Sequence, residues 1–137
     1  MSLTQKHVNQ LAYEIVGCAI EVHKELGPGL LESVYEKCLI YELDEKGLDA
    51  KSQVPIPIHY KKSAIDANYK LDILVEDLII VELKAVEKML PVFQAQLITY
   101  LTLAKKPKGL LINFNSKNII TNLIPIVTPQ FAKLPKA

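Results

Sequence analysis

The sequence predicts an α/β protein whose mixed central sheet is flanked by helices, and three observations lead to this class. Two long segments with apolar residues at helical spacing come first, and short apolar runs typical of strands follow them. A further helical segment then separates the last predicted strands from the earlier ones. The resulting order is helix, helix, three strands, helix, two strands, which favours helices packed against a mixed sheet.

The length of 137 residues fits a single domain with a substantial core. We expect this domain to span residues 1–124, and we expect residues 125–137, which contain three prolines and show no periodicity, to form an extended or flexible tail. Cys18 and Cys38 fall in predicted helices without metal-ligand spacing, which indicates free thiols in a reducing compartment. No apolar run approaches the roughly 20 residues that cross a bilayer, and the N-terminus lacks a signal-peptide core. The sequence therefore predicts a soluble, cytoplasmic protein without a membrane partner.

The charges are distributed unevenly along the chain. All 15 acidic residues lie at or before Glu87, whereas seven lysines and no acid occur from Lys88 onward. This C-terminal part could attract phosphate, or its lysines could be ordinary solvated side chains. All 16 basic residues are lysines, and an ammonium group contacts phosphate as a point charge, without the bidentate fork that arginine presents to guanine. If nucleic acid binds, we expect backbone contacts and little base readout.

The first predicted helix ends at the sequence Gly27-Pro28-Gly29, because glycine suits a helix C-terminus and proline cannot continue a helix. His23 lies in its last turn, where we expect the imidazole to favour the negative end of the helix rather than to bind a metal. Apolar residues at spacings of three and four give the helix one buried stripe, formed by Val8, Leu11, Ala12, Ile15, Cys18, Ala19, Val22 and Leu26.

The second predicted helix runs from about Leu30 to Lys46 and stops at Gly47. Its first turn contains the pattern GxxExxY, in which Glu32 and Tyr35 lie three residues apart on one helical face. A glutamate in a first turn is also what the helix dipole favours, so a purely structural role for Glu32 stays open. The residues expected to face inward are Leu31, Val34, Cys38, Leu39 and Tyr41.

Residues 53–60 alternate between polar and apolar side chains, which is typical of a half-buried strand. Pro55 and Pro57 remove backbone donors along one side only, so we expect this strand at the edge of the sheet. Residues 61–67 then predict a polar turn. Asp66 in this turn is a rival metal ligand, but it lies farther from the following hairpin end than Asp72 does.

Residues 71–84, with the sequence LDILVEDLIIVELK, predict a β-hairpin that carries charges where a buried strand should have none. Glu82 and Lys84 are two residues apart and therefore project from the same face of the second strand. An acid and a base thus share one small space. The alternative is a surface aspartate at Asp72 and an exposed Glu/Lys pair at a frayed strand end.

The register of this hairpin decides whether Asp72 and Glu82 can act together. A two-residue turn at Glu76 and Asp77 would place Asp72 opposite Val81, and the two carboxyl groups would then lie on opposite faces of the sheet. For the two carboxyl groups to share a face, the strand register must shift by an odd number of residues. We therefore predict a three-residue turn, a β-bulge, or a bend near Asp72 that ends regular pairing.

The third predicted helix begins at Pro91, whose missing N–H costs nothing at a first helical position, and runs to about Ala104. Gln96 and Tyr100 lie one helical turn apart on this helix. Either they act together as a functional pair, or Tyr100 packs in the core and Gln96 is an ordinary polar residue beside it. Residues 109–114 predict a buried strand and residues 118–124 another, and neither contains a catalytic candidate.

These motifs together resemble the small bacterial GxxExxY proteins, a branch of the PD-(D/E)XK nuclease superfamily. The likeness covers residues 15–114 in one uninterrupted order: HKELGPGLLESVYEKCL, a Gln-x-Pro strand, the Asp…Glu-x-Lys hairpin and a glutamine-rich helix. Gln96 and Tyr100 form a QxxxY pattern that is similar to the helix after the Glu-x-Lys strand of RecB-like nucleases. The resemblance implies an αβββαβ core like that of restriction endonucleases, and it implies a fold more securely than a substrate.

The resemblance also implies a metal-dependent nuclease mechanism. Asp72 and Glu82, with Glu32 and the Leu83 carbonyl as further ligands, would hold one or two Mg²⁺ or Mn²⁺ ions, which prefer oxygen ligands. A metal would also relieve the repulsion among clustered carboxylates. Lys84 would orient the attacking water or stabilise the phosphorane.

Substrate contacts would fall to Gln96, Tyr100 and Tyr35, and the substrate would be DNA or RNA bound through its backbone. The rival hypothesis is a module that keeps the fold and binds nucleic acid or protein without catalysis, although the intact Asp72, Glu82 and Lys84 argue against a degenerate site. The sequence leaves a homodimer open as an assembly.

Overall fold

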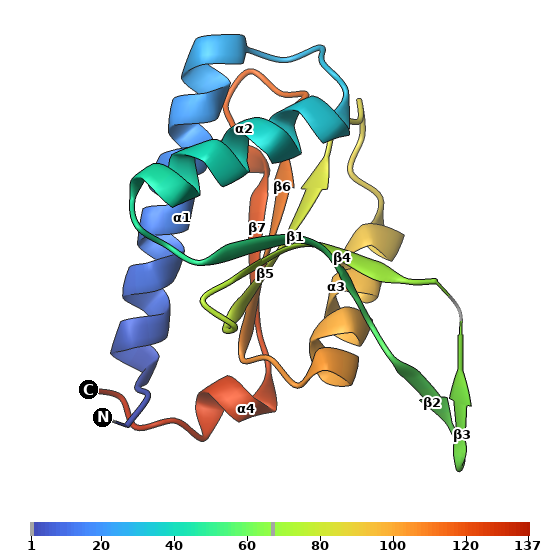
Figure 1. The fold of residues 1–137 in the computed structure, drawn as a ribbon. Coiled ribbons are helices and arrows are strands. Elements are labelled where there is room, and N and C mark those ends of the chain that lie inside the picture. The colour runs from blue at the N-terminus through green and yellow to red at the C-terminus, as the bar shows by residue number, and fades with distance from the viewer. Residues whose placement is uncertain (1, 67) are drawn as a thin grey trace.

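The computed structural model describes residues 2–66 and 68–137 and confirms the α/β class with a mixed five-stranded sheet flanked by helices (Figure 1). Ala67, at the end of the predicted polar turn, and Met1 lie outside the described residues. The helices are α1 (Gln5–Leu26), α2 (Glu32–Glu45), α3 (Pro91–Ala104), the short α4 (Pro129–Ala132) and a 3₁₀ turn (Ile120–Asn122). The strands are β1 (Ala50–Pro55), β2 (Ile58–Tyr60), β3 (Ser63–Ile65), β4 (Lys70–Val75), β5 (Ile79–Lys84), β6 (Lys108–Asn113) and β7 (Leu123–Val127).

The main sheet has the strand order β1-β4-β5-β6-β7. Strands β1, β4 and β5 pair antiparallel, β5 and β6 pair parallel through the α3 crossover, and β7 returns antiparallel to β6. A parallel pair needs a crossover of this kind, and a helix of the length of α3 supplies it. Strand β5 therefore lies in the middle of the sheet, buried between neighbours on both sides.

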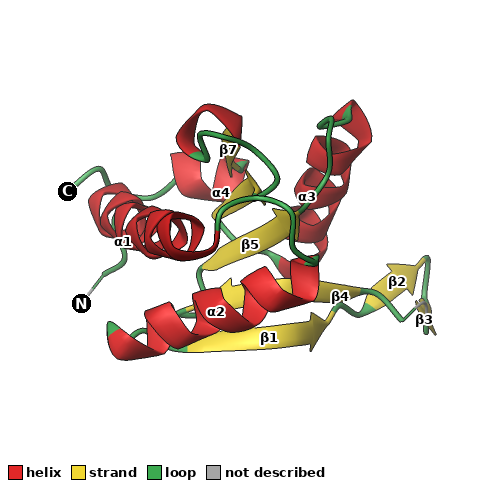
Figure 2. Ribbon diagram, turned by 90° about the horizontal axis from the view of Figure 1, so that it is seen from above, coloured by secondary structure: helices red, strands yellow, loops and turns green. Residues whose placement is uncertain are grey.

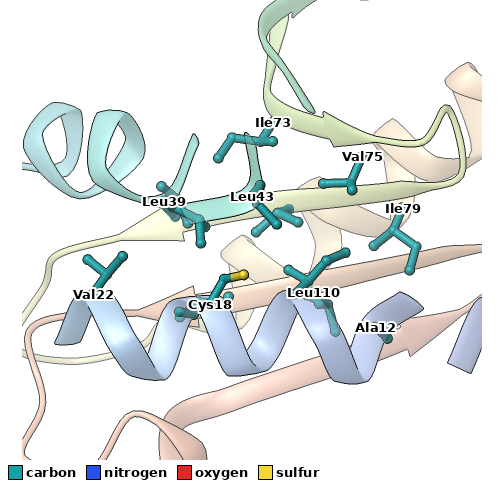
Figure 3. Packing of buried hydrophobic residues seen from close by; sticks show 14 of the residues in the cluster. Ala12, Cys18, Val22, Leu39, Leu43, Ile73, Val75, Ile79 and Leu110 are labelled. Atoms are coloured by element: carbon teal, nitrogen blue, oxygen red, sulfur yellow. The ribbon is translucent and has the colours of Figure 1, made fainter. Parts of the chain in front are cut away.

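Helices α1 and α2 cover one face of the sheet and α3 covers the other (Figure 2). The residues of β5 alternate between these faces: Ile79, Val81 and Leu83 belong to the core under α1 and α2, whereas Ile80 belongs to the core under α3. Figure 3 shows the first core, where side chains from both helices meet side chains from β4, β5 and β6. The even-numbered residues Glu82 and Lys84 thus project toward the α3 side.

Helix α1 follows the sequence prediction. Its buried stripe has the expected members from Val8 to Val22, but Leu26, which was also expected in the stripe, is exposed in the last turn. The Thr4 side chain caps the N-terminus by accepting a hydrogen bond from the His7 N–H at 3.1 Å. The helix stops at Gly27, whose φ of +67° suits glycine. The His23 imidazole donates a hydrogen bond from Nε2 to the Ser116 carbonyl at 2.8 Å, so the ring joins α1 to the segment after β6.

Helix α2 exists where the sequence predicts it, but it packs through a different stripe. Its buried residues are Tyr35, Leu39 and Leu43, which recur at i, i+4 and i+8. Of the residues expected to face inward, only Leu39 is fully buried, and Leu31, Val34 and Tyr41 are exposed. The inward face was misassigned because apolar residues occur on more than one side of this helix.

The edge position predicted for the proline-containing strand is correct, since β1 forms one edge of the main sheet. The continuous strand expected over residues 53–60 is wrong, because the chain leaves the sheet after Pro55. Strands β2 and β3 instead pair with each other over Ile58 and Ile65 and form a separate hairpin that extends beyond α3 (Figure 1). The predicted polar turn at residues 61–67 thus contains β3. We call residues 58–65 the β2–β3 arm.

The C-terminal residues are also more ordered than the sequence predicts. The boundary expected after residue 124 falls inside β7, and the strand expected over residues 118–124 begins only at Leu123, after a 3₁₀ turn. Phe131 and Leu134 pack against the core of α1 and α2, and the Gln5 N–H donates to the Pro135 carbonyl at 2.8 Å. The two termini therefore lie side by side (Figure 1).

Both cysteines are free, with Cys18 buried and Cys38 partly buried. Among the described residues, no helix combines the length and the apolar character that crossing a bilayer requires.

Candidate active site

Asp72 and Glu82 lie directly opposite each other where β4 and β5 leave regular pairing. The turn between these strands contains three residues, 76–78, so Val75 pairs with Ile79. Continuing the same register places Asp72 opposite Glu82, and directly opposed residues share a face of the sheet. Of the predicted alternatives, a three-residue turn, a β-bulge or a bend near Asp72, the three-residue turn is observed, and it places the two carboxyl groups on the α3 side.

Side-chain hydrogen bonds replace the backbone ladder at this point. The Asp72 N–H donates to Oε1 of Glu82 at 3.1 Å, and the Leu83 N–H donates to Oδ2 of Asp72 at 2.9 Å. On the other side of β4, the residue that faces Asp72 in the β1 register is Gln53, whose φ of +54° marks a local distortion of the edge strand. The β1 pairing thus skips the position of Asp72, and on the β5 side the Asp72 N–H donates to the Glu82 carboxylate instead of to a backbone carbonyl.

The Glu82 carboxyl group is the most perturbed group of the site. The side chain is only 7% exposed, and burial, followed by the neighbouring Asp72 carboxylate, raises its pKa to about 9. The Asp72 N–H and the more distant Lys84 act in the opposite direction but do not compensate for burial. A divalent cation fits this pair, because it prefers oxygen donors and would supply the positive charge that the ionised carboxylates lack.

Lys84 ends β5 on the same face as Glu82. Its Nζ lies 4.5 Å from the centre of the Phe93 ring, at the start of α3, in a cation–π contact. The Lys84 carbonyl accepts a hydrogen bond from the Phe114 N–H at 2.8 Å, which holds the strand end against the chain after β6. The ammonium group is thus kept at the carboxylate end of the sheet while it stays partly accessible.

Glu32 opens α2 near the same end of the sheet. Its pKa is raised, first by partial burial and also by the Asp72 carboxylate, whereas Lys84 and the Ala85 N–H lower it. These opposing influences mean that Glu32 lies within electrostatic reach of the carboxylate pair. Among the described residues, however, no cluster of three or more His, Cys, Asp or Glu side chains has the spacing of a metal site. Glu32 therefore lies at the margin of the pair rather than within it.

Tyr35 does not face a substrate, contrary to the role expected for it. Its side chain is fully buried and its ring stacks on Phe114 with ring centres 4.6 Å apart. The hydroxyl donates to the Gly27 carbonyl at 2.6 Å and accepts from the Leu30 N–H at 3.1 Å. Tyr35 therefore holds the turn before Glu32 in place, and the tyrosine of the GxxExxY pattern has a structural role here.

Gln96 and Tyr100 line a groove of about 250 Å³ along α3, on the same side as the carboxylates. Gln96 is exposed and Tyr100 is partly buried. Burial raises the pKa of Tyr100, with further contributions from Glu82, Tyr69 and Asp72, so its phenol lies close to the site. The other residues of the groove are Ile58, Tyr69, Val92, Ala95, Thr99 and Leu103.

Sequence reasoning missed Asn113, a buried polar residue at the end of β6. Its Oδ1 accepts from the N–H groups of Val86 and Asn115, both at 3.1 Å, and its Nδ2 donates to the Val86 carbonyl at 2.9 Å. Asn113 thereby clamps the chain just after Lys84. The signal that singled out Asp72, a polar side chain inside an apolar run, also marks Asn113 in the run GLLINF.

A family model described as the PD-(D/E)XK nuclease superfamily matches residues 9–123, which include every predicted site residue. No curated protein and no solved structure matches the chain.

Proposed function

Because the chain belongs to the PD-(D/E)XK nuclease superfamily, we propose that it is a metal-dependent nuclease that hydrolyses phosphodiester bonds of DNA or RNA with little sequence preference. The observation that carries the proposal is the convergence of Asp72 and Glu82 at one strand end, with Lys84 on the same face. An ordinary hairpin does not require a register that places a buried glutamate beside a partly buried aspartate.

The residues of this strand end have separate tasks. Asp72 and Glu82 would hold Mg²⁺ or Mn²⁺, with the Leu83 carbonyl and Glu32 as further oxygen donors. When bound, such a cation would polarise the phosphodiester and make the attacking water easier to deprotonate. The Lys84 ammonium group would donate hydrogen bonds to the attacking water or to the phosphoryl oxygens, where negative charge develops.

The protein would hold its substrate through phosphate contacts. The chain contains no arginine, and lysine ammonium groups bind phosphates as point charges without reading base edges in a fork. Binding should therefore weaken steeply with salt, because each phosphate contact releases condensed counterions. The all-lysine composition therefore supports binding with low sequence preference. It does not distinguish DNA from RNA, because both carry the same phosphate groups.

The direct experiment is a cleavage assay with single-stranded and duplex DNA and RNA, with Mg²⁺ or Mn²⁺ and with EDTA. Cleavage should require the metal, and Asp72→Asn, Glu82→Gln and Lys84→Ala should each remove it. Glu32→Gln should have an intermediate effect. Asp66→Asn is the matched control, since Asp66 is exposed on the segment after β3 and should not be needed.

Thermal unfolding separates the roles of these residues. At a metal concentration about 100 times the dissociation constant, Mg²⁺ should stabilise the wild type by about 2.7 kcal/mol. Asp72→Asn and Glu82→Gln should lose this gain, whereas Lys84→Ala should keep it, because lysine is not a ligand. If the metal stabilises the wild type but no nucleic acid is cut, the protein is a binding module rather than a nuclease.

A further inference from the structure

The β2–β3 arm, the residue before β4 and α3 together present a row of tyrosines on the carboxylate side of the molecule. Tyr69 precedes β4 and is 48% exposed, and its ring centre lies 6.2 Å from that of Tyr100 on α3. Ile58 of β2 lines the same groove as these two rings. Residues two apart on a strand share a face, so Tyr60, which is 64% exposed, continues the row toward the tip of the arm. We call Tyr60, Tyr69 and Tyr100 the tyrosine row.

The inner end of this row reaches the candidate active site. Tyr100 and Phe93 lie seven residues apart on α3, and both pack against the core under α3. This core contains Leu71, which is next to Asp72 in β4, and Ile80, which lies two residues before Glu82 on the same face of β5. Phe93 in turn contacts the Lys84 ammonium group. A ligand lying along the groove would therefore approach the reacting carboxylates from the side of Tyr100.

The outer end of the row carries positive charge. Lys61 and Lys62 form the turn of the arm, Lys70 follows Tyr69, and all three are exposed. Nζ of Lys61 lies 5.5 Å from the centre of the Tyr60 ring. Residues 56–70 contain these three lysines and one acid, Asp66. Exposed aromatic rings interleaved with lysines are the combination that binds unpaired nucleotides, because the rings stack on bases while the ammonium groups contact phosphates.

We infer that the groove between α3 and the β2–β3 arm binds a single-stranded segment of nucleic acid, whose unpaired bases stack on Tyr60 and Tyr69 and whose backbone leads past Tyr100 to Asp72 and Glu82. This inference rests on the proposed nuclease function and specifies its substrate class. Bases within a duplex are covered on both faces by their neighbours, so exposed tyrosines can stack only on bases that are unpaired. A nucleic acid single strand uses both features at once, since its bases stack on exposed ring faces and its phosphates contact the lysines, whereas a protein ligand has no need of this combination.

The test is fluorescence anisotropy with a labelled oligonucleotide of about 16 nucleotides, single-stranded or annealed to its complement. It is carried out with Ca²⁺ and again with EDTA, so that binding is observed without cleavage. The single strand should bind more tightly than the duplex. Tyr69→Ala should weaken single-strand binding by roughly tenfold, and Tyr60→Ala should weaken it less, because Tyr60 lies farther from the site. Tyr69→Phe, which keeps the ring, should bind like the wild type.

Tyr13→Ala is the matched control, because Tyr13 is equally an exposed tyrosine but lies on α1, on the other side of the sheet. Melting curves establish that each variant is folded. If duplex binds as tightly as single strand, if neither binds, or if Tyr69→Ala binds like the wild type, the inference is wrong, even when the wild type cleaves nucleic acid. If binding depends on Tyr69 but nothing is cleaved with Mg²⁺, the inference holds and the catalytic proposal fails.

Discussion

The two faces of the central sheet differ in what their side chains do. Among the described residues, the core under α1 and α2 contains 19 buried residues, whereas the core under α3 contains seven. The α3 face also carries the carboxylate pair, the Lys84 ammonium group and the groove with its partly exposed tyrosines. One face therefore supplies most of the hydrophobic stabilisation, and this allows the other to keep charged and aromatic groups in reach of a substrate.

Strand β5 makes this division possible because each of its residues serves one face. Its side chains alternate, so Val81 and Leu83 complete the larger core while Glu82, between them, projects to the α3 side. A shift of the register by one residue would exchange these roles and bury Glu82 under α1 and α2. The three-residue turn is thus the local feature on which both the core and the site depend.

The largest expected effect is a loss of stability from a cavity under α1 and α2. Leu39 is 0% exposed in this core, so Leu39→Ala should lower the free energy of unfolding by about 2–5 kcal/mol. Leu31→Ala removes the same atoms from the same segment at a site that is 73% exposed, and it should change stability by less than about 0.5 kcal/mol. Urea denaturation of both variants measures the difference. Equal losses would contradict the burial of Leu39 in the core under α1 and α2.

The second prediction concerns the negative charge of Glu82 on the α3 face, which destabilises the metal-free protein when the carboxyl group ionises. Because the pKa of Glu82 is about 9 in the folded protein and 4.5 is its ordinary value, the folded state binds one more proton than the unfolded state between these pH values. The metal-free wild type should therefore lose stability as the pH rises through this window. Glu82→Gln cannot ionise and should therefore be more stable than the wild type in the upper part of the window.

Urea titrations in EDTA at several pH values test this prediction, with Glu45→Gln as the control, because Glu45 is an exposed glutamate at the end of α2. Near pH 4.5 the pH-dependent difference between the wild type and Glu82→Gln should nearly vanish, since Glu82 is then protonated in the folded state and half protonated in the unfolded state. If the stabilities of these two proteins changed in parallel with pH, the pKa of Glu82 would not be raised in the folded state.

The parts of the fold that local patterns specify were predictable. The apolar stripe that ends before Gly27 predicted α1, and Pro91 marked the start of α3. In each case neighbouring residues along the chain carry the information. The pairing of Asp72 with Glu82 did not come from local pattern alone, because a two-residue turn at Glu76 and Asp77 would have placed them on opposite faces. The shared metal site that the family resemblance implies is what required the odd register.

The parts that depend on distant contacts were not predictable. The C-terminal segment has no periodicity of its own, but Gln5 and Pro135, at opposite ends of the chain, form a backbone hydrogen bond that orders it. The groove forms between α3 and Ile58 and Tyr69, which come from an earlier part of the chain. No local pattern contains such a pairing, so the sequence indicated Gln96 and Tyr100 but gave no reason to select Tyr69.

The smallest expected effect tests whether the α1/α2 face only stabilises the fold. Tyr35→Phe keeps the buried ring against Phe114 but removes the hydroxyl that joins Gly27 to Leu30 just before Glu32. The lost hydrogen bonds should cost about 1 kcal/mol of folding stability. If this turn also positions Glu32, the variant should show a smaller thermal shift with Mg²⁺ than the wild type. Tyr41→Phe, on the exposed side of α2, should change neither quantity. A loss of stability with an unchanged metal response would restrict Tyr35 to packing and would leave the two faces independent.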